Sequence, residues 1–379
     1  MKILFYSKGL NRPKGGAQSV GFKQYSKLSE NNNVHIIPVT DLKFKGEIIH
    51  LLPKKYRSFI IPRVSFIYNF IWENWIIKRK LNQIIELIKP DVIHIHGYGG
   101  YYPRVDGKYK NKTLLTIHDE IYYIGSDKVS NGILSLLEKL YYLLSLREKK
   151  KAINNYGYFQ ALSNRMINQI EYAGGLKKNI FKIFNSIDDL EYKVEKRDDK
   201  KFEYLLMLSS IENKKRVIDG YNVLNHFDNK LKFVHTGGIL STFGRQYYNQ
   251  VKKHKNRHKA FHLKRVTGKK KFKLIKRSIA MISLSRSESF GLTILEALKL
   301  DIPVIMTKTG ATDYFKEISD KIILLDLNYT EEDLQNAVIK LLYDDEFKRS
   351  KNKLYKIKSW RTISEEIEKL YNIIKHNSI

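Results

Sequence analysis

Residues 285–297 read Ser-Arg-Ser-Glu-Ser-Phe-Gly-Leu-Thr-Ile-Leu-Glu-Ala, and this segment is the most informative part of the sequence. It follows an apolar run at 279–284 that is typical of a buried strand, and residues 292–300 have the pattern of a helix. Gly291 is therefore expected at a strand-to-helix turn. At such a turn the backbone N–H groups of the helix N-terminus can hold a phosphate, and glycine lets the ligand approach closely.

Two glutamates flank this turn, Glu288 in the predicted loop and Glu296 in the first turns of the predicted helix. A carboxylate suits the hydroxyls of a sugar or a ribose because its oxygens accept several hydrogen bonds. The pair is also compatible with a structural role, in which Glu288 is exposed and Glu296 caps the helix or pairs with a base. Taken alone, the two glutamates leave both interpretations open.

Short β-rich runs alternate with helical stretches on both sides of this segment, the pattern of parallel sheets covered by helices. In the first half the predicted strands are 2–6, 34–39, 90–97, 114–119 and 159–163, and the predicted helices are about 17–29 and 64–88. In the second half the predicted strands are 204–208, 232–236, 259–263, 279–284, 303–306 and 322–325. Ligands gather at the carboxyl ends of parallel strands, so we expect His118 and the 15–16 loop to face one cleft.

The length of 379 residues exceeds that of one ordinary core and favours two domains. The charged stretch 191–201 is interpreted as the linker between them. We therefore predict an N-terminal domain over 1–186, a C-terminal domain over 200–355, and a tail over 356–379 that forms an amphipathic helix from about residue 361.

The composition, with 42% apolar and 28% charged residues, is that of a folded protein. The absence of cysteine excludes disulfides and thiolate metal sites, and it favours a reducing compartment. The N-terminus lacks the apolar run of a signal peptide, and the best membrane-span candidate, 60–77, contains Pro62, Arg63 and Glu73. We therefore expect a cytoplasmic protein, either soluble or peripheral on the inner face of the plasma membrane.

The formal net charge of +30 would attract nucleic acid, anionic lipid headgroups or phosphorylated substrates. Lysines are scattered along the whole chain, which also fits a bias of the proteome toward solvated lysines. Residues 251–277 stand apart because they contain thirteen Lys or Arg and no Asp or Glu. No nucleic-acid reading module is visible in the sequence, so nucleic acid is not favoured as a partner.

Basic and aromatic residues interleave over 54–80, where the spacing predicts a helix with basic ends. This helix could lie on an anionic membrane surface. It could equally be a core helix with solvated ends, and the sequence leaves these alternatives open.

The sequence gives little support for a metal site. No two aspartates are spaced two apart, so an Asp-x-Asp metal site is absent. His94 and His96 have the spacing of a metal pair on one face of a strand, but no third ligand is evident nearby. We therefore expect no metal requirement.

The segment 281–310 closely resembles the signature of glycosyltransferase family 4, in which a Glu, a Phe-Gly-Leu, a second Glu and then Pro-Val recur in this order. Here they are Glu288, 290–292, Glu296 and 303–304, followed by Gly310. Weaker similarities extend along the chain: 15–18 looks like the family's Gly-Gly loop, 118–119 like its cleft histidine, 185–188 like its interdomain Asn-Gly-x-Asp, and Trp360 precedes a last helix.

The resemblance implies the GT-B fold, in which two Rossmann-like doubly wound domains face a cleft. The N-terminal domain would bind the acceptor, the C-terminal domain would bind a nucleotide sugar, and the C-terminal helix would pack back on the N-terminal domain. In the N-terminal domain, His118 would lie near the anomeric carbon and Gly16 near the diphosphate.

In the C-terminal domain, matched position implies that Glu296 binds the ribose hydroxyls and Glu288 the transferred sugar. The backbone amides of Phe290, Gly291 and Leu292 would face the sugar and the diphosphate. Retention in this family is usually explained by front-face attack, with the leaving phosphate taking the acceptor's proton. Such a mechanism needs charge that stabilises the leaving diphosphate more than it needs a protein base.

The chain departs from the family at the diphosphate clamp, which usually consists of an Arg and, five or six residues later, a Lys. Both candidate Arg positions, Ser209 and Ser210, are serine, whereas Lys214 and Lys215 remain and Arg216 follows. We expect Lys215, with Lys214 or Arg216, to carry the phosphate charge. The missing Arg is also compatible with impaired or altered donor use.

We predict an enzyme that transfers a hexose-type sugar, with retention, from a UDP- or GDP-linked donor and uses no cofactor or metal. The acceptor would be a saccharide, lipid-linked in the leading version, of bacterial envelope polysaccharide, capsule or lipopolysaccharide synthesis. The alternatives are a nucleotide-sugar epimerase, a transferase for a small soluble acceptor, and a non-catalytic carbohydrate- or phosphate-binding scaffold. Serine at positions 209 and 210 favours the scaffold slightly.

Overall fold

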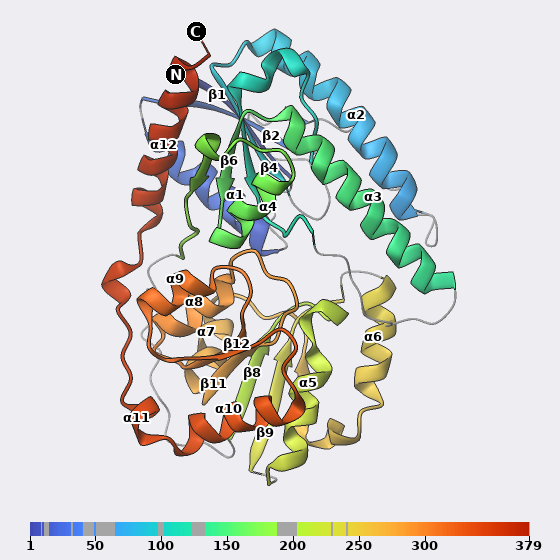
Figure 1. The fold of residues 1–379 in the computed structure, drawn as a ribbon, viewed down its shortest axis with the longest axis vertical. Coiled ribbons are helices and arrows are strands. Elements are labelled where there is room, and N and C mark those ends of the chain that lie inside the picture. The colour runs from blue at the N-terminus through green and yellow to red at the C-terminus, as the bar shows by residue number, and fades with distance from the viewer. Residues whose placement is uncertain are drawn as a thin grey trace. The chain divides into compact units, whose positions relative to one another are not determined.

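The computed structural model describes residues 1–8, 10, 15–31, 33–40, 49–50, 65–97, 102–122, 133–187, 203–228, 230–239 and 242–378. The chain forms two compact units (Figure 1). The N-terminal unit comprises Met1–Ile124, Leu140–Ser186 and Lys358–Ile379, and the C-terminal unit comprises Gly125–Lys139 and Ile187–Ile357. The predicted linker, 191–201, and the 54–64 part of the basic and aromatic segment lie outside the described residues.

The N-terminal unit contains a parallel sheet of seven strands in the order β3-β2-β1-β4-β5-β6-β7. The strands are β1 (Lys2–Ser7), β2 (His35–Thr40), β3 (Ile49–His50), β4 (Val92–Gly97), β5 (Thr113–Ile117), β6 (Tyr158–Ala161) and β7 (Ile180–Lys182). Every residue of β4, β5 and β6 is buried, as expected for strands covered on both faces. The strand order reverses between β1 and β4, which is where ligands bind in open sheets of this kind.

Helices connect the parallel strands of this unit: α1 (Gly16–Leu28), α2 (Ser65–Ile88), α3 (Ile133–Asn155), whose part from residue 140 belongs to this unit, and α4 (Asn164–Tyr172), with 3-10 turns η2 (Gly107–Lys112) and η3 (Lys177–Asn179). The predicted strands and the helices near 17–29 and 64–88 are confirmed, whereas the short edge strands β3 and β7 were not predicted. Among the described residues, no helix combines the length and the apolarity needed to cross a membrane.

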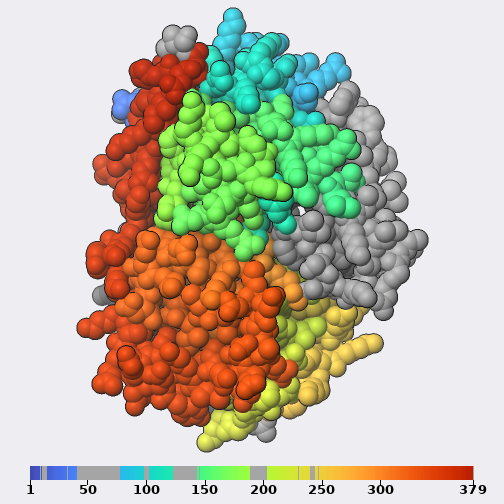
Figure 2. Space-filling model, viewed as in Figure 1, coloured from blue at the N-terminus to red at the C-terminus, as the bar shows by residue number. Residues whose placement is uncertain are grey.

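The last helix, α12 (Trp360–His376), belongs to the N-terminal unit, where it packs on α1 and forms part of the surface (Figure 2). Its buried residues recur at helical spacing and include Trp360, Ile363, Ile367, Leu370, Tyr371 and Ile374. Ser359 caps the helix by accepting a hydrogen bond from the Thr362 N–H at 3.1 Å. The expected return of the last helix to the N-terminal domain is confirmed.

The C-terminal unit has a parallel sheet of six strands in the order β10-β9-β8-β11-β12-β13. The strands are β8 (Glu203–Leu208), β9 (Leu231–Thr236), β10 (Ala260–Leu263), β11 (Ala280–Ser283), β12 (Val304–Thr307) and β13 (Ile322–Leu325), and all six were predicted. The helices are α5 (Val217–Asn222), α6 (Thr242–Lys252), α7 (Gly268–Arg277), α8 (Leu292–Lys299), α9 (Thr312–Ile318), α10 (Glu331–Tyr343) and α11 (Asp345–Lys348), with 3-10 turns η4 (Asn213–Lys215), η5 (Val223–His226), η6 (Lys255–Lys259) and η7 (Leu354–Lys356). Each unit is therefore a doubly wound α/β domain.

Candidate active site

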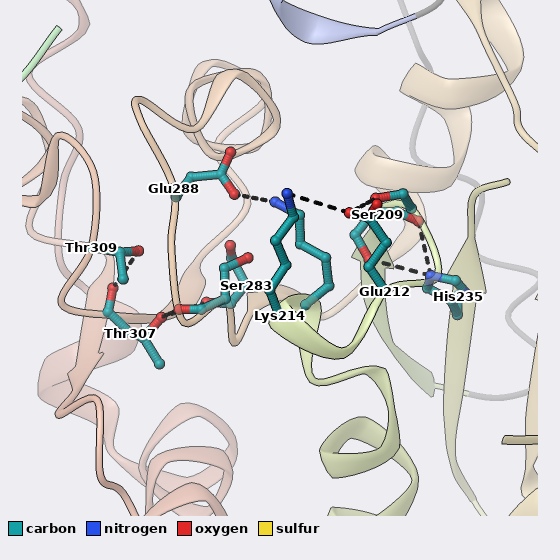
Figure 3. Close-up of polar contacts among 11 residues, drawn as sticks. Ser209, Glu212, Lys214, His235, Ser283, Glu288, Thr307 and Thr309 are labelled. Carbon is teal, nitrogen blue, oxygen red and sulfur yellow. Dashed lines mark hydrogen bonds and ion pairs between the residues drawn. The ribbon is translucent and has the colours of Figure 1, made fainter. Parts of the chain in front are cut away.

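Polar loops gather at the carboxyl ends of three strands in the C-terminal unit (Figure 3). The loop after β8 carries 209–216, the loop after β11 carries 285–291, and β12 is followed by 308–310. The strands are parallel and adjacent, so these loops meet at one edge of the sheet. A hydrogen bond from the Arg286 N–H to the Lys214 carbonyl, 2.8 Å long, joins the first two loops.

Gly291 directly precedes α8, which confirms the prediction that it lies at a strand-to-helix turn. Its φ of 109° lies in the left-handed region, and a Cβ there would come within 2.7 Å of Ile294 Cδ1. Leu292 begins the helix, and the N–H groups of Ile294 and Leu295 donate to the Gly291 carbonyl at 3.0 and 3.2 Å. The N–H groups of Leu292 and Thr293, which come before them, have no acceptor within the helix. These groups are available to an anion that approaches the turn.

Phe290, before the turn, is buried, and its ring packs on Phe315 with a centroid distance of 5.4 Å. The side chain therefore anchors the loop in the interior of the C-terminal unit. Gly310 supports the loop from the other side, because a Cβ at this position would lie 2.9 Å from the carbonyl oxygens of both Glu288 and Phe290. The final glycine of the quoted motif is therefore required by close packing against its first part.

Glu288 and Lys215, which were predicted to bind the sugar and the diphosphate, form a hydrogen-bonded ion pair. The side chains are 24% and 16% exposed, so both charges lie at the margin between protein and solvent. The pair joins the loop after β11 to η4 after β8. The structure thus brings together two predicted site residues that are far apart in the sequence.

Lys214, the second predicted phosphate ligand, lies 3.5 Å from the carboxylate of Glu212, which also accepts a hydrogen bond from the Ser210 hydroxyl at 3.0 Å. Burial raises the pKa of Glu212, but the charges of Lys214 and Lys215 outweigh this effect and hold that pKa below its ordinary value. Glu212 is therefore an ionised member of the loop. No motif in the sequence singled it out.

Arg216, the third cation considered for the phosphate, is buried. Its guanidinium donates to the Leu327 carbonyl at 2.6 Å and lies over the Tyr329 ring, 4.7 Å from the centroid. These contacts hold the side chain in the packing between α5 and the loop before α10. Of the three cations in this loop, Lys215 and Lys214 are therefore the better candidates to bind an anion.

Glu296 lies on α8 and is 8% exposed. Its Oε1 accepts a hydrogen bond from Lys271 Nζ on α7 at 2.5 Å, whereas Oε2 is buried and has no hydrogen-bond partner among the described residues. Burial raises the pKa of Glu296, and the Lys271 charge opposes the rise. The carboxylate therefore keeps one acceptor for a hydroxyl donor. Lys271, its ion-pair partner, is a residue of the candidate site that sequence reasoning missed.

Several other basic residues of 251–277 bond to backbone carbonyl groups. Arg257 donates to the Ala260 carbonyl at 2.7 Å, Lys276 to the Leu300 carbonyl at 3.0 Å, and Lys259 to two carbonyls of the 224–227 turn. This part of the basic run stabilises the fold of the C-terminal unit. Solvated charge alone does not account for the run.

Two predicted site residues belong to the N-terminal unit. Gly16 lies between β1 and the body of α1, and His118 directly follows the carboxyl end of β5. Gly16 is the first residue of α1. The His118 N–H donates to the Gly97 carbonyl at 2.9 Å, and its Nε2 lies 2.8 Å from His96 Nδ1. Burial lowers the pKa of His118 to about 4, so the ring is neutral near pH 7.

Strand pairing brings His118 against His96, and the two rings are joined by a hydrogen bond. In the part of the chain that the structure describes, no group of three or more His, Cys, Asp or Glu side chains is arranged to hold a metal ion. Both ring nitrogens of His94 are engaged, one by Tyr371 and the other by Thr116.

Comparison with known proteins gives matches in sequence and in fold. Residues 188–360 match the family described as glycosyl transferases group 1. The N-acetyl-alpha-D-glucosaminyl L-malate synthase of Bacillus anthracis is 23% identical over 353 residues, which cover 89% of this chain and 87% of that protein.

Solved structures share the fold at low sequence identity. The sucrose-phosphate synthase of Thermosynechococcus elongatus superposes with a TM-score of 0.74 at 14% identity, covering 98% of each chain. HepE of Anabaena, in complex with UDP, gives 0.68 at 14% identity over 98% of this chain and 100% of that one. WaaG, a glycosyltransferase of lipopolysaccharide biosynthesis, gives 0.62 at 14% identity over 100% and 98%. Residues 188–360 therefore carry the sequence pattern of the group 1 glycosyl transferases, and the chain has the GT-B fold.

Proposed function

We propose that this protein is a retaining glycosyltransferase that moves a hexose-type sugar from a nucleotide-sugar donor to a saccharide acceptor. The observation that carries the proposal is the edge of the C-terminal sheet, where Lys215, Glu288, the start of α8 and Glu296 occur within a segment of the group 1 pattern. Support for the donor class comes from HepE, whose solved complexes contain UDP and UDP-glucose.

In this proposal the unpaired Oε2 of Glu296 accepts a hydrogen bond from a ribose hydroxyl of the donor. The backbone amides of Phe290, Gly291 and Leu292 meet the sugar and the diphosphate. Anions are stabilised at such a helix start because the N–H groups and the helix dipole favour negative charge. In this proposal the nucleotide is UDP or GDP, each of which offers a ribose and a diphosphate to these groups.

Lys215, assisted by Lys214, neutralises the diphosphate. Before the donor binds, Glu288 serves as the counter-ion of Lys215, which avoids the cost of a partly buried charge without a partner. When the diphosphate takes over this contact, the Glu288 carboxylate becomes available to a hydroxyl of the transferred sugar. One exchange of partners would therefore prepare both residues for the donor.

The reaction in this proposal proceeds on one face of the sugar. The bond between the anomeric carbon and the diphosphate oxygen breaks, the acceptor hydroxyl oxygen bonds to that carbon from the same side, and a leaving phosphate oxygen takes the hydroxyl proton. The protein mainly stabilises the charge that develops on the diphosphate, through Lys215 and the N–H groups of α8. His118 and Gly16 of the N-terminal unit are proposed to serve the sugar and the diphosphate, respectively.

Donor screening tests the proposal. Thermal denaturation with UDP- and GDP-sugars should show a rise of the midpoint with one nucleotide class, because a ligand that binds only the folded state stabilises it. Lys215→Met should lower turnover by roughly a hundredfold, in line with loss of one charge-stabilising group. Glu296→Gln should weaken donor binding by about tenfold, the effect of one hydrogen bond to a charged group. Lys340→Met, which removes an exposed lysine paired with Asp344 on α10, serves as the matched control.

Two results would reject the enzyme. One is the absence of any stabilising nucleotide sugar, and the other is turnover in Lys215→Met equal to that of the Lys340→Met control. Donor binding without transfer or hydrolysis would instead favour the non-catalytic scaffold. Unchanged turnover after EDTA treatment is expected, because we propose that no metal or cofactor takes part.

We propose further that the acceptor is a lipid-linked saccharide of bacterial envelope polysaccharide, presented in the cytoplasm at the inner face of the plasma membrane. The net charge of +30 and the basic residues near α2 support this location, and WaaG offers a precedent in lipopolysaccharide biosynthesis. Flotation with anionic vesicles at low salt should recover the protein, and neutral vesicles should not. Recovery with neither kind of vesicle would favour a small soluble acceptor.

A further inference from the structure

A chain of four buried hydrogen bonds fixes the proton positions around His94. His94 Nδ1 lies 2.6 Å from the Tyr371 hydroxyl, and Nε2 lies 2.7 Å from Thr116 Oγ1. Thr116 Oγ1 lies 2.6 Å from Gln160 Oε1, and Gln160 Nε2 donates to the Ile183 carbonyl at 3.1 Å.

The directions follow from the last bond. The carbonyl of Ile183 can only accept, so the Gln160 amide directs its nitrogen there and its oxygen toward Thr116. Thr116 therefore donates its single proton to Gln160 and accepts from His94 Nε2–H. His94 Nδ1 has no proton and accepts from the Tyr371 hydroxyl.

His96, two residues along the same strand, requires the opposite tautomer. One proton lies between His96 Nδ1 and His118 Nε2, which are 2.8 Å apart. His96 Nε2 is buried and has no hydrogen-bond partner among the residues that the structure describes. An unsatisfied buried N–H is rarer and costlier than an unpaired acceptor, so the proton belongs on Nδ1. His96 therefore donates to His118.

Accepting at Nε2 places the proton of neutral His118 on its other nitrogen, Nδ1. The low pKa of His118, which results from burial, agrees with a neutral ring. The surroundings hold the donor in place. The Phe5 ring lies 4.8 Å from that of His96 between centroids, and α1 comes close at Gly21, where a Cβ would be 3.4 Å from His96 Nδ1.

We propose that His96 is a positioning residue that keeps His118 in the Nδ1-protonated tautomer, so that His118 serves the reaction as a neutral hydrogen-bond donor to a sugar oxygen and not as a base. No described residue accepts a hydrogen bond from His118 Nδ1, which leaves this N–H for a ligand. The assignment of the tautomer stands on the fold alone. The identity of the sugar as its acceptor rests on the proposed function.

Nitrogen NMR of the full chain labelled with ¹⁵N-histidine tests the tautomer without any substrate. His118, assigned by its loss in His118→Asn, should show a protonated Nδ1 and an unprotonated Nε2 near pH 7. His94 should show the reverse pattern and serves as the internal reference. A protonated Nε2 on His118 would overturn the proposal.

Two substitutions at position 96 then test the positioning role. The amide nitrogen of His96→Asn can occupy the place of Nδ1 and donate, so the His118 tautomer should persist and kcat should stay within about threefold of wild type. His96→Met removes the donor, and kcat should fall roughly tenfold, as for loss of one hydrogen bond, while the KM for the donor changes less than about threefold. His94→Gln, matched in burial and strand, should leave the His118 signals unchanged.

The outcomes separate this inference from the proposed function. Equal kcat in His96→Met and wild type would overturn the positioning role, even where Glu296→Gln still weakens donor binding and so supports the enzyme. Failure of every nucleotide sugar would reject the enzyme, whereas the NMR pattern of His118 would still confirm or refute the tautomer.

Discussion

Replacing Lys271 by Met tests whether its amine holds Glu296 in the ionised form. The Lys271 Nζ lies 2.5 Å from Glu296 Oε1, and the two side chains are 23% and 11% exposed. Removing one member of a fully buried ion pair costs about 3–5 kcal/mol because the other charge is left unpaired. Solvent around Lys271 reduces this figure, and we expect a loss of about 2 kcal/mol in the free energy of unfolding. For a unit of this size, such a loss lowers the Tm by roughly 4–8 °C.

The loss should depend on pH with a definite sign. Burial already raises the pKa of Glu296 above the ordinary 4.5, and without Lys271 nothing opposes that rise. The folded variant then binds a proton that the unfolded chain releases, so its stability relative to wild type improves as pH falls toward 4.5. The deficit should be largest near pH 8 and smaller near pH 5.5.

Calorimetry of the full chain at the two pH values provides the measurement. Lys321→Met is the matched control, since Lys321 forms a 2.7 Å pair with Asp301, whose side chain is 60% exposed. Such a surface pair should contribute less than about 1 kcal/mol. The double variant Lys271→Met, Glu296→Gln should recover most of the loss. A deficit that is absent, or equal at both pH values, would refute the reasoning about the buried carboxylate.

Three further predictions concern the buried polar groups and the glycine of the motif. Tyr371→Phe leaves His94 Nδ1 without its donor and should cost about 1–3 kcal/mol in urea unfolding; an unchanged midpoint would contradict the assigned hydrogen bond. Gly310→Ala places a Cβ 2.9 Å from the Glu288 carbonyl oxygen at a φ of 57°, so it should lower the free energy of unfolding by roughly 1–3 kcal/mol and weaken UDP binding in a titration. UDP binding equal to that of wild type would contradict the packing of Gly310 against the loop. The free energy of unfolding should fall as pH drops below 6.5, because burial lowers the pKa of His94 to about 3 and that of His118 to about 4, whereas the same histidines in the unfolded chain take up protons. At about pH 5 each of the two histidines should lower the free energy of unfolding by about 2 kcal/mol. His94→Gln should therefore make the free energy from urea unfolding depend less steeply on pH.

The sequence predicted the interior of both sheets because buried parallel strands are continuous apolar runs. In the C-terminal unit, the central strands β8, β11 and β12 have this character over most of their length. β3 and β7 escaped prediction because they lie at the edges of the sheet and have two and three residues, too few for a pattern. The return of α12 was expected from the family resemblance and not from the periodicity of that segment, which shows a helix but not its neighbour.

The candidate site was predicted residue by residue but not pair by pair. Glu288 and Glu296 were found from the motif, whereas their partners, Lys215 and Lys271, are 73 and 25 residues away in the sequence. The order of the strands in the sheet brings such partners together, and the spacing of the residues in the sequence does not reveal that order. Lys271 has many basic neighbours of similar appearance, so nothing in the sequence distinguished it. His96 was noted as a metal candidate, although its actual partner follows from the pairing of β4 with β5.

The contact between His94 and Tyr371 spans 277 positions of the chain, and the whole C-terminal unit lies between them in the sequence. During synthesis the strands of the N-terminal sheet leave the ribosome long before α12 does. The apolar surface that α12 covers, and the His94 ring nitrogen that Tyr371 bonds, therefore stay uncovered until the C-terminal unit has been synthesised. Folding of this protein is thus nested: the unit that is begun first is completed last, and the nascent chain needs protection over that interval.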